Sequence, residues 1–126
     1  MSVAASPIDA LFDRIRQIDG FLLACLVDGT SGMMMGSVQE QGDLSVPVAG
    51  AGACDVVNVL SLMTGELALK GDLEDVIVTL TSHYHLIRKL EIGSSGPLVL
   101  LVTLDKPQTN LAMALREVRD LTASLT

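Results

Sequence analysis

The sequence predicts an α/β fold in a single domain, with the element order αββαβββα. Three observations lead to this prediction: apolar residues recur at helical spacing near both ends of the chain, continuous apolar runs bounded by turn residues lie between them, and the composition is strongly aliphatic. Hydrophobic residues make up 49% of the chain and aromatic residues only 2%. A core of aliphatic side chains suits a sheet that is covered by helices. With 126 residues the chain is long enough for one packed core and too short for two, so we expect one domain over residues 1–126 with a core at about 6–125.

The first helix is predicted to begin at Pro7. Ser6 supplies a capping hydroxyl, Pro7 suits the first helical position, and Asp9 places a carboxylate near the free N-terminal amides. Gly20 is expected to end the segment. The apolar residues in between lie at i, i+3, i+4, i+7 and i+10 and form one stripe: Ile8, Leu11, Phe12, Ile15 and Ile18.

Two strands and a loop are expected next. Residues 21–27 form a continuous apolar run that ends at Asp28 and Gly29, which is typical of a strand buried on both faces. Residues 33–38 can return beside it as a hairpin partner. Residues 39–49 are polar and contain a glycine and a proline, so they predict a loop.

A long second helix is predicted over residues 50–69, which contain no proline, with Gly71 as the stop signal. The residues expected to cover the sheet share one face: Ala53, Val56, Leu60, Met63 and Leu67. Other apolar residues lie away from that face, interspersed with polar ones: Val59, Leu62 and Leu69, with Asp55, Asn58 and Glu66. An isolated exposed leucine is normal on any protein surface. A helix that is apolar on two sides otherwise needs a second surface to cover it.

The second half of the chain begins with two more strands. Residues 72–81 contain the β-branched run 76–81, and His83 with Tyr84 is expected to turn the chain into a further strand over residues 85–92.

A hairpin turn over residues 93–96 is predicted to lead into a fully apolar strand over residues 97–104. The last helix is expected to start at about Thr109. Its apolar residues lie on one face: Leu111, Leu115, Val118, Leu121 or Thr122, and Leu125.

Four features occur together in this chain. They are a first hairpin reading G-F-L-L-A-C-L-V-D-G-T-S-G over residues 20–32, a long apolar second helix, a fifth strand reading P-L-V-L-L-V-T-L-D over residues 97–105, and a last helix over residues 110–125 that carries an asparagine. In this combination the chain resembles the Roadblock (dynein light chain) family, and in particular its bacterial members that regulate small GTPases. The resemblance covers residues 8–121 or so and contains no catalytic constellation.

The resemblance implies a five-stranded antiparallel sheet of the Roadblock/profilin-like type, with the long second helix on one side and the terminal helices on the other. It also implies a homodimer formed through the second helix and the third strand. The third strand fits this role because its run 76–81 contains no lysine, proline or inward-pointing charge, the usual devices that protect an exposed strand edge. The predicted interface residues are Asp55, Asn58, Val59, Leu62, Glu66, Leu69, Val76, Ile77, Val78, Thr79 and Leu80.

Charge and composition exclude several classes of partner. The net charge is −7, and the eight basic residues form no cluster longer than Arg88-Lys89, so nucleic acid and anionic membranes are not expected to bind. The longest apolar runs, 21–27 and 97–102, are far shorter than the roughly 20 residues of a membrane span. Cys25 and Cys54 lie in apolar stretches, as reduced thiols usually do, and the chain is expected to be cytoplasmic.

The residues that could support chemistry do not form a complete site. His83 and His85 would share a face of an extended strand, but further metal ligands are not evident near them. The glycine-rich start of the second helix, residues 50–55, ends in an aspartate that would repel a pyrophosphate, and no phosphate-binding G-x-x-x-x-G-K-[ST] motif occurs. No G-x-S-x-G turn is present either. We therefore expect no catalytic residue, cofactor or metal, and the chain is not predicted to be an enzyme.

Two functions remain open from the sequence. The first is a non-catalytic, homodimeric adaptor or signalling scaffold that binds a partner protein, in the way that the family resemblance implies for a Ras-like small GTPase. The second is a small-ligand sensor of profilin-like or PAS-like architecture, with a pocket between sheet and helix. A sensor needs a few polar groups that converge inside an apolar cavity, and the predicted strands provide almost none.

Overall fold

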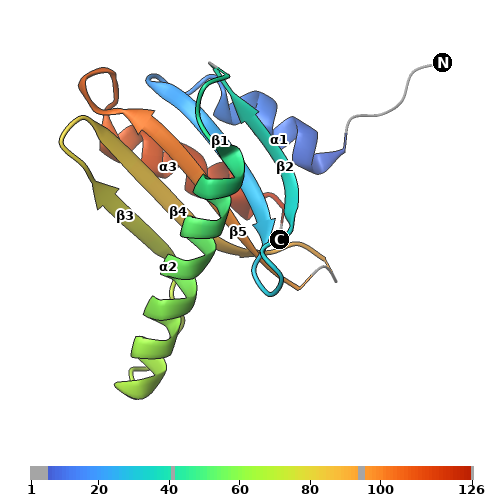
Figure 1. Ribbon diagram of the computed structural model, residues 1–126, viewed down its shortest axis with the longest axis vertical. Helices are drawn as coiled ribbons and strands as arrows, with labels where there is room; N and C mark the ends of the chain where they lie inside the picture. Colours follow the sequence, from blue (N-terminus) through green and yellow to red (C-terminus); the bar gives the residue numbers. More distant parts are fainter. Residues whose placement is uncertain (1–5, 41, 94–95, 126) are drawn as a thin grey trace.

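The computed structural model describes residues 6–40, 42–93 and 96–125. It contains five strands that pair antiparallel in the order β2-β1-β5-β4-β3, with α2 on one face and α1 and α3 on the other (Figure 1). The predicted α/β class and element order are confirmed. The elements are α1 (Pro7–Ile15), β1 (Phe21–Asp28), β2 (Met34–Gln39), α2 (Val46–Glu66), β3 (Asp75–Thr79), β4 (His83–Glu91), β5 (Pro97–Asp105), a 3₁₀ turn η1 (Lys106–Gln108) and α3 (Leu111–Ala123).

The core has two layers because the central strands β1 and β5 are covered on both faces. Alternate side chains along a strand point to opposite faces, so each of these strands contributes to both layers, which explains their continuous apolar runs. The larger layer lies under α1 and α3 and includes Ile15, Leu26, Leu100 and Val102, all of them fully buried. The layer under α2 is built from smaller side chains: Cys25, Val27, Ala53, Cys54 and Val57, with Ile87, Val99 and Leu101.

Side-chain caps fix where the helices begin. The Ser6 hydroxyl accepts a hydrogen bond from the Asp9 amide at 3.1 Å, and Asn110 caps α3 by accepting from the Met113 amide at 3.1 Å. The α2 helix begins at Val46, inside the stretch that was predicted to be a loop. Ser45 caps it, and a proline is tolerated in the first turn because the amides there have no partner within the helix.

The face that α2 turns to the sheet differs from the predicted one. Its buried residues are Gly50, Ala53, Cys54 and Val57, whereas Val56, Met63 and Leu67 of the predicted set are exposed. Small side chains allow a close approach: a Cβ added to Gly50 would lie only 2.8 Å from Cγ1 of Val27 and 2.9 Å from Cε of Met34. The small residues of α2 therefore pack against the sheet, and its large apolar residues lie on the exposed side.

Boundaries in the second half also differ in detail. His83 and Tyr84 belong to β4 rather than to a turn, and the chain reverses just before them, where the Leu80 amide donates to the His83 carbonyl at 2.8 Å. The last helix starts two residues after Thr109, because η1 and the Asn110 cap precede it. Of the predicted turn at 93–96, residues 94 and 95 lie outside the described residues.

Length and apolar composition would allow one described helix, α2, to cross a membrane. The continuous apolar runs of the sequence do not indicate a span at α2, because small and polar residues interrupt the apolar ones along this helix. In the fold, α2 lies across the sheet with its small residues buried.

Candidate protein-interaction surface

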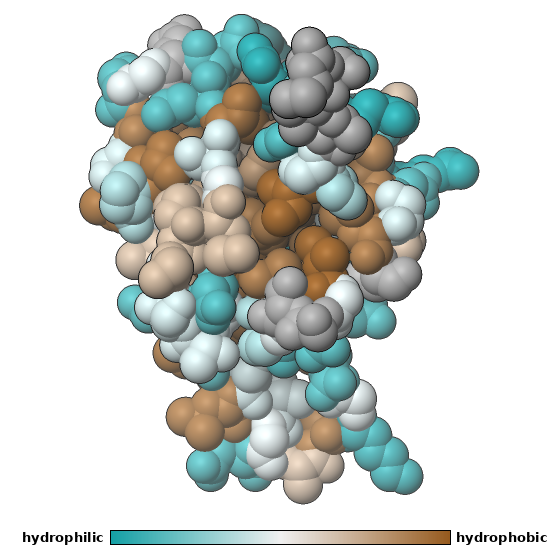
Figure 2. All heavy atoms as spheres, turned by 90° about the vertical axis from the view of Figure 1, so that its right-hand side faces the viewer, coloured by the Kyte–Doolittle hydropathy of each residue, from teal (hydrophilic) through white to brown (hydrophobic). Residues whose placement is uncertain are grey.

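The outer side of α2 and the residues just after it carry a set of large apolar side chains that the sheet does not cover. Val59, Leu62 and Leu69 are 64%, 66% and 60% exposed, and Met63 and Leu67 are exposed beside them. The C-terminal half of α2 projects beyond the sheet (Figure 1), and hydrophobic and polar side chains are interspersed on this projecting end (Figure 2). A surface of this kind is typical of a protein contact.

The polar residues predicted for the interface lie on the same helix. Asp55, Asn58 and Glu66 are all exposed, as are Val59 and Leu62. The Asn58 side-chain amide lies 3.6 Å from the Cys54 sulfur. Leu69 follows the helix end, so every predicted residue of this segment is accessible to a partner.

The β3 strand is an outer edge of the sheet, with β4 as its one neighbour among the described strands. Its register with β4 pairs Val76 with Ile87 and Val78 with His85, which turns both valines toward the α2 side. Ile77 is exposed on the opposite side, and Thr79 and Leu80 are exposed at the end of the strand. The outer backbone groups of β3 are thus available to a further strand.

An apolar groove of about 500 Å³ separates α2 from the β3 edge. We call it the α2–β3 groove. Its walls are formed by Val48, Ala53 and Val56 of α2, Val78 of β3, His85 and Ile87 of β4, and Leu101 and Thr103 of β5. It joins the two parts of the predicted interface, the helix and the edge strand, into one surface.

His85 is the main polar group in this groove. Its Nδ1 lies 2.8 Å from the Thr103 hydroxyl. Burial lowers the pKa of His85 below its ordinary value, and the nearby charge of His83 lowers it further. Both effects favour a neutral ring, which is compatible with an apolar partner over the groove.

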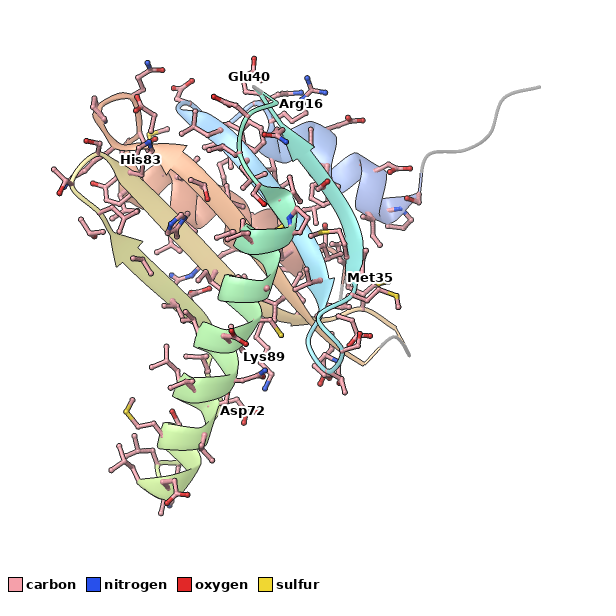
Figure 3. All side chains as sticks on the ribbon, viewed as in Figure 1. Arg16, Met35, Glu40, Asp72, His83 and Lys89 are labelled. Carbon is pink, nitrogen blue, oxygen red and sulfur yellow. The ribbon has the colours of Figure 1, made fainter. Side chains whose placement is uncertain are left out.

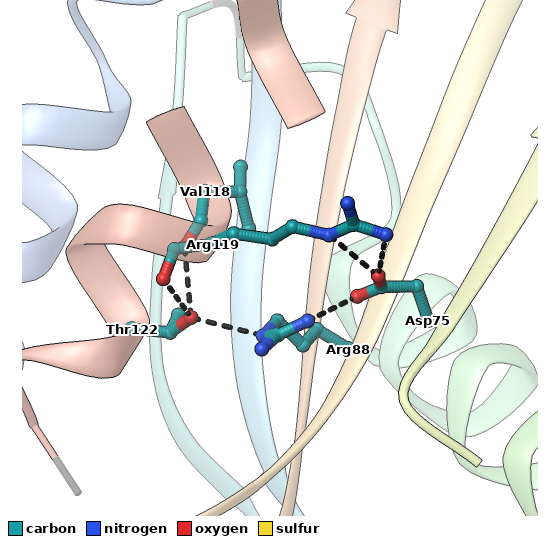
Figure 4. A network of polar contacts seen from close by, with 5 residues as sticks. All are labelled: Asp75, Arg88, Val118, Arg119 and Thr122. Atoms are coloured by element: carbon teal, nitrogen blue, oxygen red, sulfur yellow. Dashed lines mark hydrogen bonds and ion pairs between the residues drawn. The ribbon is translucent and has the colours of Figure 1, made fainter. Parts of the chain in front are cut away.

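A network of ion pairs ties β3 to the opposite side of the sheet (Figure 4). The Asp75 carboxylate is nearly buried and binds two guanidinium groups, that of Arg88 at 2.5 Å and that of Arg119 at 2.6 Å. Arg88 also donates to the Thr122 hydroxyl at 3.0 Å. The edge strand is therefore held in place by β4 and α3 independently of its hydrogen-bonded ladder.

The sequence placed a pocket between sheet and helix only as part of the sensor alternative and named no residues for it, and it did not predict this network. Small residues of α2, among them Ala49, Gly52 and Ala53, line the groove, and no apolar pattern in the sequence marks it. The signal for the network was present as an acidic first residue in β3 and as basic residues on β4 and α3. Only the antiparallel register, which pairs Asp75 with Arg88, brings these charges together.

The thiols are buried, and the imidazoles belong to no group of metal ligands among the described residues. Both cysteines are free and buried, and burial raises the pKa of Cys25 to about 11, so this thiol stays protonated at neutral pH. Across residues 6–40, 42–93 and 96–125, no three His, Cys, Asp or Glu side chains are grouped so that they could hold a metal ion.

The fold is similar to those of solved bacterial proteins. It matches Myxococcus xanthus MglB with a TM-score of 0.81 at 16% identity, covering 100% of this chain and 92% of that one. A Roadblock/LC7 domain from Streptomyces avermitilis gives 0.76 at 20% identity and 94% coverage of both chains. The gliding protein MglB from Thermus thermophilus gives 0.74 at 11% identity, covering 99% of this chain and 92% of that one. Neither a protein-family model nor a curated protein matches the sequence. The chain has the Roadblock fold, as its resemblance to that family implied.

Proposed function

We propose that the chain is a non-catalytic, homodimeric regulator that binds a Ras-like small GTPase in the cytoplasm and alters its nucleotide cycle. The observation that carries this proposal is the continuity of three unpartnered features: the apolar outer side of α2, the α2–β3 groove and the free β3 edge. The family resemblance seen in the sequence supplies the class of partner, and the similarity of the fold to those of the MglB structures supports that resemblance.

Symmetry determines how two copies would fit. If the β3 strands of two copies pair antiparallel in one continuous sheet, the two-fold axis runs perpendicular to that sheet. Both α2 helices then lie on the same face, on either side of the axis. Each groove opens toward the partner helix, so the apolar side chains of α2 gain the second surface that one sheet does not supply.

The dimer also creates a composite surface for a third protein. The projecting halves of the two α2 helices lie on one face of the joined sheet, and each presents exposed apolar side chains, such as Leu67, next to acidic ones, such as Glu66. We expect a GTPase bound there to be influenced by contact, because the sequence shows no phosphate-binding or nucleophile motif and the described residues contain no group of metal ligands.

The substitution Leu62→Glu tests the proposal. An isologous contact contains each residue twice, so the variant would bury two uncompensated carboxylates and dissociate the dimer. Light scattering at micromolar concentration should give a dimer mass for the wild type and a monomer mass for Leu62→Glu. Met113→Glu is the matched control: Met113 is 65% exposed, close to the 66% of Leu62, but lies on α3 across the sheet.

The same proteins serve in a GTPase assay. We expect the wild type and Met113→Glu to change the rate of GTP hydrolysis or nucleotide exchange of a Ras-like GTPase from the same organism, and Leu62→Glu to lose this effect. The chain alone should release no phosphate. A monomeric wild type would contradict the dimer, and an unchanged GTPase rate would contradict the regulatory role.

The α2–β3 groove favours a second candidate function, that of a small-ligand sensor. Its volume of about 500 Å³ lies within the roughly 300–1,000 Å³ of small-molecule sites. Only three polar side chains, Ser45, His85 and Thr103, line it, and His85 and Thr103 already bond to each other. Native mass spectrometry of the purified protein separates the two functions, since a sensor retains a bound small molecule and a dimer interface does not.

A further inference from the structure

A small pocket of about 240 Å³ lies on the far side of α2 from the groove, where the helix meets the ends of β4 and β5 and the turn after β1. We call it the Lys89 pocket. Its polar lining consists of Thr30, Asn58, Ser61 and Lys89. We infer that this pocket receives a carboxylate side chain, Asp or Glu, of a protein bound to α2.

The first observation is an unsatisfied hydroxyl. The Ser61 Oγ is buried and has no hydrogen-bond partner among the described residues. Within the same helix Thr64 satisfies its hydroxyl by donating to the Leu60 carbonyl at 2.9 Å, so the geometry of α2 allows such a bond and Ser61 does not make it. A buried hydroxyl without a partner is costly, and an acceptor that enters the pocket would remove that cost.

The second observation is an unpaired cation. Lys89 points to the α2 side of β4, as Ile87 does, and lies beside the middle of α2 (Figure 3). None of the salt bridges in the described part of the chain involves its ammonium group. No acidic residue lines the pocket, although the chain contains 15 acidic and only 8 basic residues. An ammonium, two hydroxyls and a side-chain amide provide the donors that a carboxylate requires.

The size of the pocket identifies the kind of carboxylate. Its volume lies below the roughly 300–1,000 Å³ of sites for free small molecules, but it accommodates the head of one side chain. Asn58 and Ser61 line the side of α2 that is turned away from the α2–β3 groove, and therefore away from the dimer contact proposed across that groove. A protein that covers this side of the helix would therefore pass the pocket. The inference rests on the proposed function and adds an acidic anchor to the surface of the partner.

Binding of the chemical group itself can be measured without the partner. In an NMR titration with sodium acetate, the amides of Asn58, Ser61 and Lys89 should shift in a saturable way, and sodium chloride at equal ionic strength should not reproduce the shifts. Lys89→Met retains the aliphatic stem and should weaken acetate binding by about tenfold. Lys106→Met is the control, because Lys106 lies over the Tyr84 ring and does not line the pocket. Equal shifts with chloride, or an equal loss in Lys106→Met, would overturn the inference.

A second arm tests the source of the carboxylate. Lys89→Met should remain a dimer by light scattering and bind the GTPase about tenfold more weakly than the wild type does. If Lys89→Met becomes a monomer, the carboxylate in the Lys89 pocket comes from the second copy of the chain, and its assignment to the bound GTPase is wrong. If the wild type is itself a monomer or binds no GTPase, the proposed function fails, whereas the acetate titration still reports on the pocket.

Discussion

His85 introduces a titratable group into an otherwise apolar groove. Its ring faces Thr103 of β5, the valine side chains of α2 and β3, and the charge of the neighbouring His83, and no carboxylate of the described residues lines the groove with it. The pKa of His85 is lowered in the folded chain from its ordinary value of 6.5. As the pH falls below 6.5, the ring therefore binds a proton more readily in the unfolded chain than in the folded one. Stability from this group is therefore complete above about pH 6.5 and is lost as the pH falls through the folded pKa.

We predict that His85→Gln reduces the pH dependence of folding between neutral pH and mildly acidic pH. Glutamine can keep a hydrogen bond to the Thr103 hydroxyl but does not titrate. Urea unfolding at a fixed protein concentration should show the wild type losing stability as the pH falls, with a smaller loss in the variant. His83→Gln serves as the control and should retain most of the wild-type slope. Identical slopes in the wild type and His85→Gln would show that this ring does not carry the effect.

At the scale of elements, sequence patterns located the helices and strands more accurately than they predicted which faces of those elements pack together. The cap at Ser6 and the apolar runs of β1 and β5 were sufficient to place those elements. The α2 helix was placed correctly in kind, but its start was missed because the stretch that contains Pro47 was interpreted as a loop. Of its predicted sheet-facing set only Ala53 is buried, and the other buried residues include Gly50 and Cys54, which are small. Their importance lies in the close approach that they permit, and this is a property of the packed pair of surfaces.

The ion pairs between β3 and α3 lead to a prediction at this scale. Asp75→Asn keeps the shape of the side chain but leaves Arg88 and Arg119 without their shared anion, so we expect a loss of about 3 kcal/mol in the free energy of unfolding. Asp120→Asn breaks an exposed pair with Arg116 at 3.9 Å and should cost less than about 0.5 kcal/mol. Chemical denaturation of both variants measures the difference. Equal small losses would mean that solvent screens the Asp75 network as fully as it screens the surface pair.

For the molecule as a whole, the apolar patterns distinguish central strands from edge strands but do not determine the strand order. The fully apolar β1 and β5 are central, and the mixed patterns of β2 and β3 belong to the two edges. The family resemblance implied a five-stranded antiparallel sheet with the third strand at the dimer edge, but not the full order β2-β1-β5-β4-β3, since several antiparallel arrangements satisfy the same patterns. Along β3, alternate backbone amides point to β4 and to the free edge. The register of β3 with β4 shows which amides face the free edge and could bond to a second copy.

This alternation separates two neighbouring substitutions on the β3 edge. The Leu80 amide donates to the His83 carbonyl and the Lys89 amide to the Glu74 carbonyl. Because hydrogen-bonded pairs alternate along an antiparallel ladder, the amides of Val76 and Val78 face β4, and those of Ile77 and Thr79 face the free edge.

We therefore predict that Thr79→Pro weakens the dimer and spares the fold, whereas Val78→Pro damages the fold itself. An edge proline whose nitrogen faces outward removes no bond within the chain. In a symmetric dimer it removes one intermolecular bond from each copy, which weakens dimerisation by about 2 kcal/mol and raises the dimer dissociation constant well over tenfold. Hydrogen exchange across a dilution series of the wild type provides the independent check. The amides of Ile77 and Thr79 should lose protection as the dimer dissociates, while those of Val78 and of the central strand β5 should keep it; protection of Ile77 and Thr79 that does not depend on concentration would exclude β3 as the dimer edge.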